Sequence, residues 1–261
     1  MTDSPLIRTV RHDQGVVEVV LDRPEAMNAV STAMAGALTA VGEELRTDTS
    51  VRAVVVTSSH EKAFCVGADL KERNGFSDDD LRAQRPGNRL AYRALHDLPV
   101  PTIAAVDGHA LGGGCEIALA CDLIVAGPRA SFALPEVSVG VIPGGGGTQL
   151  LTRRIGWSRA ADLIFTARRV AGEEARALGL VDRVVEDAKG EALAIAGTVA
   201  QHSPVGVRNA KAAMRGGLDL TLDEGLDLED ARWHDTAFSA DRAEGVRAFA
   251  EKRAPEWPGL G

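Results

Sequence analysis

The chain has few cysteines and no long hydrophobic run, and each shortage excludes a class of protein. It contains three cysteines, Cys65, Cys115 and Cys121, none of them in a CxxC pair. No disulfide framework is therefore expected. No stretch of 18 apolar residues occurs, and the first residues contain no apolar signal core, which argues against a membrane span and a secretion signal. We therefore expect a soluble, cytoplasmic protein.

Basic charge is also in short supply. The 29 Lys and Arg residues are outnumbered by 37 Asp and Glu, which gives a net charge of -8. Binding to nucleic acid needs a clustered basic face, so nucleic acid is not expected as a partner. The charge balance still allows an anionic small molecule that is held by local groups.

Several motifs that accompany glycine-rich turns are missing. The sequence has no GxxxxGK string followed by Ser or Thr, no GxGxxG fingerprint, no GxSxG elbow, no HExxH and no EF-hand loop, and its six histidines show no metal-ligand spacing. The two glycine runs, 112–114 and 144–147, are therefore not explained by phosphate loops, and no metal site is predicted.

The segments that are present alternate between strand and helix patterns. β-Branched runs such as VVEVVLD and VRAVVVTSS predict buried strands, and Ser31 is a candidate cap for a helix that continues to about residue 46. The polar segment 71–88 suggests a mobile, lid-like loop before a helix near 88–97. The end of the chain is almost wholly helical, with helices expected at 191–201, 204–214, 221–237 and 240–252. We predict an α/β fold with a core of residues 1–190 and a helical region of residues 191–261.

The first glycine run precedes a lone glutamate, Glu116, in the apolar stretch LGGGCEIALA. Glycine lets the backbone approach a ligand closely, and the first N–H groups of a helix have no internal partner. Such a turn is suited to present N–H groups to a developing oxyanion, with Glu116 beside it. The alternative is a tight turn in which Glu116 merely favours the helix dipole.

Six segments in order along nearly the whole chain resemble the enoyl-CoA hydratase/isomerase superfamily, the crotonases. They are LDRPEAMNAVS (21–31), KAFCVGADLKE (62–72), PTIAAVDGHALGGGCEIALACDLIVAG (101–127), FALPEVSVGVIPGGGGTQLLTRRIG (132–156), ARALGLVDRVV (175–185) and EGVRAFAEKRAPEW (244–257). The resemblance implies a crotonase-like spiral of ββα units, with a helical C-terminal region that builds trimers or hexamers. It also implies an acyl-coenzyme A thioester as ligand.

The resemblance further implies roles for single residues. The backbone N–H groups of Ala68 and Gly113 would form the oxyanion hole for the thioester carbonyl. Glu116 and Glu136 would be the catalytic acids, with Glu116 activating water and Glu136 donating a proton to Cα, although this assignment can be exchanged.

The coenzyme A portion has its own predicted contacts. By the resemblance, Asp69, Leu70 and Lys71 continue the loop that lines its site, and Lys252 reaches its nucleotide end, from the same subunit or a neighbouring one. The sequence departs from many hydratases at Ala133 and Leu134, which stand where Gly-Gln is common. Together with the polar segment 71–88, this departure favours a short or functionalised acyl chain.

The leading functional prediction is an enoyl-CoA hydratase that adds water reversibly across the 2,3-double bond, as in fatty-acid or related acyl-CoA metabolism. No cofactor is expected, since coenzyme A is part of the substrate. An alternative is another crotonase reaction such as double-bond isomerisation, which would use fewer acids. A further alternative is a non-catalytic homologue that binds CoA or RNA.

Overall fold

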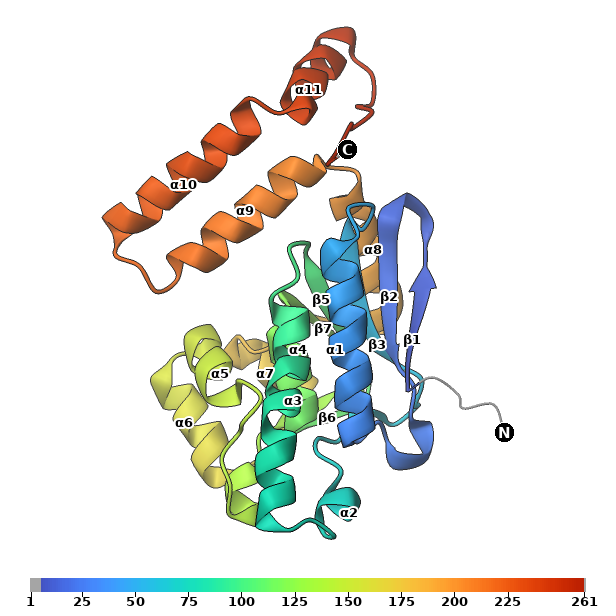
Figure 1. Cartoon of the computed structure of the whole chain (residues 1–261), viewed down its shortest axis with the longest axis vertical. Coiled ribbons are helices and arrows are strands. Elements are labelled where there is room, and N and C mark those ends of the chain that lie inside the picture. Colours follow the sequence, from blue (N-terminus) through green and yellow to red (C-terminus); the bar gives the residue numbers. More distant parts are fainter. Residues whose placement is uncertain (1–5, 261) are drawn as a thin grey trace.

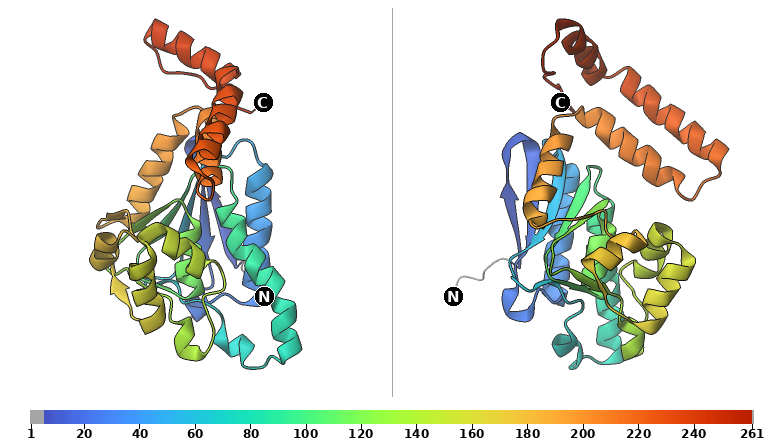
Figure 2. Two further views of the ribbon diagram at one scale, coloured as in Figure 1. Left: turned by 90° about the vertical axis from the view of Figure 1, so that its left-hand side faces the viewer. Right: turned by 180° about the vertical axis from the view of Figure 1, so that it is seen from behind.

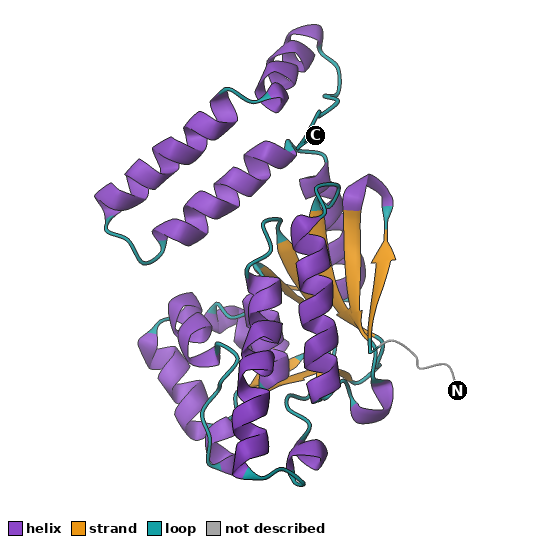
Figure 3. Cartoon of the chain, viewed as in Figure 1, coloured by secondary structure: helices purple, strands orange, loops and turns teal. Residues whose placement is uncertain are grey.

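The computed structural model describes residues 6–260, which build two β-sheets with helices around them (Figures 1 and 3). The larger sheet has the order β1-β2-β3-β5-β7-β10 and the smaller one the order β4-β6-β8-β9. The strands of the larger sheet are β1 (Ile7–Arg11), β2 (Val16–Leu21), β3 (Ala53–Ser58), β5 (Thr102–Val106), β7 (Leu123–Ala126) and β10 (Arg183–Val184). Those of the smaller sheet are β4 (Ala63–Cys65), β6 (His109–Leu111), β8 (Ser131–Ala133) and β9 (Val170–Ala171).

Eleven α-helices lie within the described residues. They are α1 (Thr32–Thr47), α2 (Leu70–Arg73), α3 (Asp78–His96), α4 (Gly113–Ala120), α5 (Gly147–Ile155), α6 (Trp157–Thr166), α7 (Gly172–Leu178), α8 (Ala188–Ala200), α9 (Pro204–Gly217), α10 (Leu222–Ala237) and α11 (Ala240–Glu251). Three 3-10 turns accompany them, η1 (Asp13–Gly15), η2 (Pro24–Ala26) and η3 (Glu136–Val139). The predicted cap of α1 is confirmed, because the Ser31 side chain accepts the N–H of Met34.

The larger sheet is buried on both faces. Its strands are parallel except for β1, and alternate residues of β3 contribute to two separate apolar clusters. Val54 and Val56 belong to the cluster that includes α1, α3 and α4, whereas Ala53 and Val55 belong to the cluster that includes α8. Since neighbouring side chains of a strand point to opposite faces, α8 covers one face and the other three helices cover the other. Because these strands are buried on both faces, their sequences are continuous apolar runs.

The segment 71–88 differs from its prediction. A lid-like loop was expected, but helix α3 begins at Asp78 and includes most of it. The Ser77 side chain accepts the N–H of Asp80, and the Asp80 side chain accepts that of Ser77, which is a capping box that starts the helix. Pro86 lies inside the helix. The polarity of the segment reflects the exposed face of this helix.

Helices α9, α10 and α11 project from the core as an arm (Figures 1 and 2). The predicted division at residue 190 falls inside α8, which packs on the sheet through Ala188, Ala192, Ala196 and Ala200. The projecting part therefore begins after Ala200.

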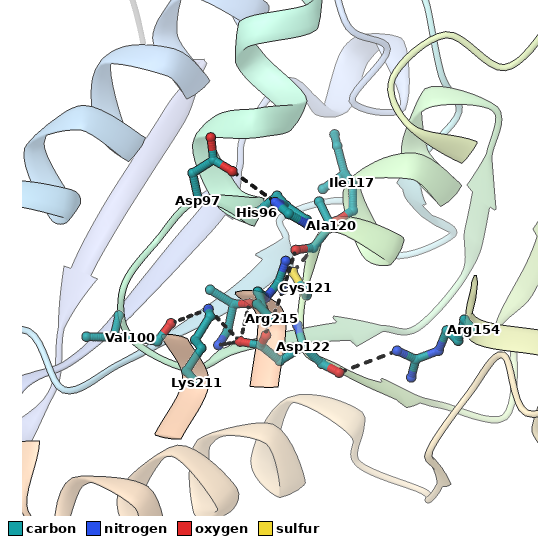
Figure 4. Close-up of polar contacts among 11 residues, drawn as sticks. His96, Asp97, Val100, Ile117, Ala120, Cys121, Asp122, Arg154, Lys211 and Arg215 are labelled. Atoms are coloured by element: carbon teal, nitrogen blue, oxygen red, sulfur yellow. Dashed lines mark hydrogen bonds and ion pairs between the residues drawn. The ribbon is translucent and has the colours of Figure 1, made fainter. Parts of the chain in front are cut away.

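A buried polar cluster ties this arm to the core (Figure 4). The Lys211 ammonium of α9 donates to Asp122 Oδ2 at 2.7 Å and to the Val100 carbonyl at 2.7 Å. Arg215 donates to the other carboxylate oxygen of Asp122 at 2.7 Å. Burial raises the pKa of Asp122, but the two cations outweigh it and hold this pKa below its usual value.

Within residues 6–260, no helix is both long and apolar enough to cross a bilayer.

Candidate active site

A cavity of about 610 Å³ lies between α3, η3, the loop after β4 and both glycine runs. Its wall includes Ala68, Gly113, Glu116 and Glu136, which come from three separate segments of the sequence. The fold brings them together because the segments after β4, β6 and β8 follow neighbouring parallel strands of the smaller sheet. The two predicted backbone amides and the two predicted carboxyl groups therefore face the same cavity.

The amides of Ala68 and Gly113 are free to donate. The residues on either side of Ala68 bond to Val30: the Val30 N–H donates to Gly67 O at 2.7 Å, and the Asp69 N–H donates to Val30 O at 3.0 Å. This parallel bridge turns the N–H of Ala68 away from Val30. Gly113 is the first residue of α4, so its N–H has no partner within the helix. Neither amide donates to an acceptor in the described part of the chain.

Glycine is required where these two segments meet. Gly67 has a φ of +92°, and a β-carbon built on it would lie 3.1 Å from the Gly113 nitrogen and 2.8 Å from Leu111 O. A β-carbon on Gly113 would lie 2.2 Å from the Tyr92 hydroxyl oxygen. The backbone of Gly67 thus reaches the Gly113 amide only because side chains are missing. Two free N–H groups beside one cavity can bind one oxyanion.

Glu116 lies one turn inside α4 and is buried. Its Oε1 accepts the N–H of Gly145 at 2.7 Å and that of Gly147 at 2.8 Å, so the second glycine run holds this carboxyl in place. Burial raises the pKa of Glu116 above its usual value, while the two N–H bonds act in the opposite direction by favouring the carboxylate. The ionised form of Glu116 therefore already has two backbone N–H groups that donate to it.

Glu136 begins η3, and its side chain lies beside Gly112 of the first glycine run. Its Oε1 would lie 3.0 Å from a β-carbon on Gly112. Its Oε2 is buried and has no hydrogen-bond partner among residues 6–260. Burial, together with the nearby charge of Glu116, raises the pKa of Glu136 to about 7. Glu136 therefore retains its proton far more readily than an ordinary glutamate.

The residues predicted to line the coenzyme A portion separate into two groups. Leu70 is exposed at the wall of the cavity, and Asp69 supports the same loop by capping α2 and by pairing with Arg23 at 2.6 Å. Lys71 is exposed on α2 and does not line the cavity. Lys252 follows α11 at the end of the projecting arm, with a φ of 55°, and does not line the cavity.

Several cavity residues were not predicted as site residues, and three of them share one face of α3. Arg85, Asn88 and Tyr92 lie on α3 and line the same cavity. Their spacing of three and four residues is the signal that was available, because such residues share one face of a helix. It was missed because the first half of α3 was interpreted as a loop.

Comparisons with known proteins give the chain its family. The sequence profile described as Enoyl-CoA hydratase/isomerase matches residues 11–259. The Bacillus subtilis protein YngF, whose name gives the same two activities, is 40% identical over 262 residues that cover both chains completely. The human mitochondrial methylglutaconyl-CoA hydratase is 41% identical over 260 residues, which cover 96% of this chain and 77% of that protein.

A solved structure agrees in fold as well as in sequence. The crystal structure of enoyl-CoA hydratase from Bacillus anthracis superposes with a TM-score of 0.93 at 39% identity, and the match covers 96% of this chain and 98% of that one. The predicted fold class is confirmed by this similarity. With its mixed α/β core, its helical C-terminal region and its sequence matched over almost the whole length, the chain belongs to the enoyl-CoA hydratase/isomerase family, the crotonases.

Proposed function

We propose that the chain is a hydratase that adds water across the 2,3-double bond of a 2-enoyl-CoA thioester. Crotonase-type enzymes act on acyl-CoA thioesters, and the names of its relatives cover both hydratases and isomerases. The observation that carries the choice is the pair of carboxyls beside the two free amides. Glu116 has N–H donors for its ionised form, and Glu136 has an unpartnered oxygen and a pKa near 7.

In the proposed reaction, the thioester carbonyl oxygen accepts the N–H groups of Ala68 and Gly113. Attack of water at C3 moves electron density onto this oxygen, and each donor of such a pair is typically worth about 100- to 1,000-fold in rate. Glu116 takes the proton that water loses, and Glu136 gives a proton to C2. One proton leaves the water and one arrives on the acyl chain, so the sum is the addition of water.

Three further proposals, on cofactors, location and assembly, accompany this function. The reaction needs no metal or separate cofactor, because coenzyme A enters as part of the substrate. The buried free cysteines suit the reducing conditions of a cytoplasmic location. A trimer or hexamer is proposed on the basis of the exposed apolar side chains of the arm. These proposals are independent of the acyl group, which differs among the named relatives.

The test replaces each carboxyl by the amide of the same size. General acids and bases typically contribute about 100- to 10,000-fold, so Glu116→Gln and Glu136→Gln should each lower hydration of a 2-enoyl-CoA by at least about 100-fold. The loss of the ultraviolet absorbance of the conjugated thioester measures the rate. Circular dichroism and binding of a saturated acyl-CoA serve as controls for folding and for the binding site.

The same experiment separates the hydratase from an isomerase. An isomerase moves one proton between two carbons of the same chain, so a single carboxyl suffices for it. If Glu136→Gln keeps full hydration activity, or if the wild-type protein only shifts the double bond of a 3-enoyl-CoA, the proposed two-carboxyl mechanism is wrong.

A further inference from the structure

We propose that the acyl pocket accepts a chain that ends in a carboxylate, and that Arg85 and Asn88 of α3 bind this carboxylate. The inference rests on the proposed function for the positions of the thioester and of the reacting carbons. The inference adds the substrate class, which is a short 2-enoyl-CoA whose acyl group derives from a dicarboxylic acid.

Arg85 is a cation at the cavity wall without an acidic partner. One of its N–H groups donates to the Gly144 carbonyl at 2.8 Å, which positions the guanidinium against the second glycine run. No carboxylate of residues 6–260 forms an ion pair with it, although acidic residues outnumber basic ones in this chain. A guanidinium has five N–H donors in a fixed plane. The donors that Gly144 leaves free match the two oxygens of a carboxylate.

Asn88 supplies a second, independent observation. It lies three residues after Arg85 on α3, on the same face of the helix, and its side chain is only 6% exposed. Its Oδ1, an acceptor, is buried without a partner, and its Nδ2, the donor, makes no hydrogen bond within the described part of the chain. Buried polar side chains nearly always have a partner. An unsatisfied amide in the wall of a substrate cavity therefore indicates a polar ligand, and the Nδ2 of Asn88 is the group that can donate to a carboxylate oxygen.

The position of Arg85 relative to Glu116 assigns it to the acyl end. Arg85 bonds to the carbonyl of Gly144, and the next residue, Gly145, donates its N–H to Glu116 at 2.7 Å. Arg85 also acts on Glu116 electrostatically and lowers its pKa, in opposition to burial. The guanidinium thus lies one peptide from the group that serves C3. The family resemblance assigns the coenzyme A portion to the loop at Leu70 instead, so Arg85 is placed for the part of the acyl chain beyond C3.

Two further arginines of α3 lie close to Arg85 and add positive charge on the same side of the helix. An adjoining pocket of about 410 Å³ is lined by Arg85, Arg89 and Arg93, which lie one turn apart on α3. Arg93 pairs with Asp97, but Arg89 forms no ion pair with any described residue. A neutral alkyl chain would leave Arg85 and the Nδ2 of Asn88 without a ligand partner, and a site with such donors discriminates against ligands that cannot bond to them.

The kinetic test compares two 2-enoyl-CoA substrates of similar length. Glutaconyl-CoA ends in a carboxylate, and 2-hexenoyl-CoA ends in an ethyl group. We expect the wild-type kcat/KM for glutaconyl-CoA to be at least about tenfold higher, the usual worth of a hydrogen bond to a charged group. Arg85→Met keeps the length of the side chain and removes its charge, so this ratio should fall by about 10- to 100-fold. Asn88→Leu should lower it less.

Arg82→Met is the matched control. Arg82 lies on the same helix, is exposed and pairs with Asp79, so its loss should leave the ratio unchanged. A wild-type ratio of one or less overturns the proposal. So does an Arg85→Met variant that loses equally on both substrates, because that result assigns Arg85 to the phosphates of coenzyme A or to Glu116.

A binding experiment keeps this proposal separate from the proposed reaction. Glutaryl-CoA and hexanoyl-CoA have no 2,3-double bond and cannot be hydrated. Titration calorimetry should give tighter binding of glutaryl-CoA to the wild-type protein, by about tenfold or more, and no preference in Arg85→Met. If the protein hydrates nothing but shows this preference, the hydratase proposal fails and the pocket proposal stands. Equal binding of both ligands to the wild type overturns the pocket proposal whatever the hydration assays show.

Discussion

Glu116 and Glu136 have identical side chains, but the hydrogen-bond donors around their carboxyl groups differ. Two N–H groups of the second glycine run bond to Glu116, whereas Glu136 has a buried oxygen without a partner in residues 6–260. Both pKa values are raised by burial. The difference in donors favours Glu116 as the base and Glu136 as the acid, because groups in unlike environments can divide these tasks.

The raised pKa of Glu136 predicts a pH dependence. A general acid acts only while protonated, so kcat/KM for hydration should fall as the pH rises through about 7, where Glu136 loses its proton. On the acidic side the rate should fall as Glu116 becomes protonated, at a pH above its usual pKa of 4.5. The profile of kcat/KM against pH should therefore be bell-shaped. A rate that stays level between about pH 6 and 9 would contradict the role given to Glu136.

Gly113 gives a steric prediction. A β-carbon there would lie 2.2 Å from the Tyr92 hydroxyl oxygen, so Gly113→Ala should shift the amide and lower kcat by about 10- to 100-fold, up to the worth of one oxyanion donor. Removing that oxygen in Tyr92→Phe leaves a nearest ring atom at 3.2 Å, and the double variant should recover part of the loss. Gly36→Ala is the control, because a β-carbon on Gly36 meets nothing within 4 Å. A Gly113→Ala protein with normal kcat would remove this amide from the oxyanion site.

At the scale of the element, the sequence predicts what local pattern determines. The strands of the larger sheet follow from unbroken apolar runs, and α1 follows from its cap at Ser31. Helix α3 was predicted only in its second half, because Pro86 and Gly87 outweighed the capping box at Ser77 and Asp80. Proline and glycine are strong signals for loops, but packing of α3 against α1 and α4 overrides them here.

The site was predicted unevenly for a related reason. Ala68, Gly113, Glu116 and Glu136 lie in motifs that the family resemblance could match, and the structure places all four at one cavity. The polar face of α3 belongs to no such motif. Its contribution depends on how this helix packs over the glycine runs, which is a tertiary arrangement that no local spacing specifies.

The contact between α9 and the core predicts a stability effect. Lys211 is 9% exposed and depends on Asp122 for its charge. Removing one partner of a buried ion pair leaves the other charge uncompensated, so Asp122→Ala should lower the free energy of unfolding by about 3–5 kcal/mol. Lys211→Met should cost less, because Asp122 keeps Arg215 and the Thr102 amide as partners. Urea unfolding measures both.

Arg153→Met provides the comparison for this pair of variants. Arg153 pairs with Asp219 on the surface, and an exposed pair contributes about 0–1 kcal/mol. If Asp122→Ala costs no more than Arg153→Met, the cluster does not anchor α9 to the core.

For the whole molecule, the arm presents apolar side chains that nothing in residues 6–260 covers. Met214, Leu222, Phe238 and Phe249 are each at least 75% exposed, and they lie on or beside α9, α10 and α11, which project from the core (Figure 2). Large apolar surfaces of this kind mark interfaces with other proteins. The same arm carries Lys252, which does not line the cavity of its own chain. A contribution of Lys252 to coenzyme A binding would therefore require the cavity of a second copy.

These features predict self-association through the arm. Light scattering should give a mass about three or six times the 27.4 kDa of one chain. The double variant Phe238→Glu/Phe249→Glu places two charges among the exposed apolar side chains, and their desolvation cost should shift the protein toward single chains. Lys62→Glu, an exposed substitution on the core, should leave the mass unchanged. A wild-type protein that scatters as a single chain at micromolar concentration would contradict the assembly, and with it any role for Lys252 at a neighbouring cavity.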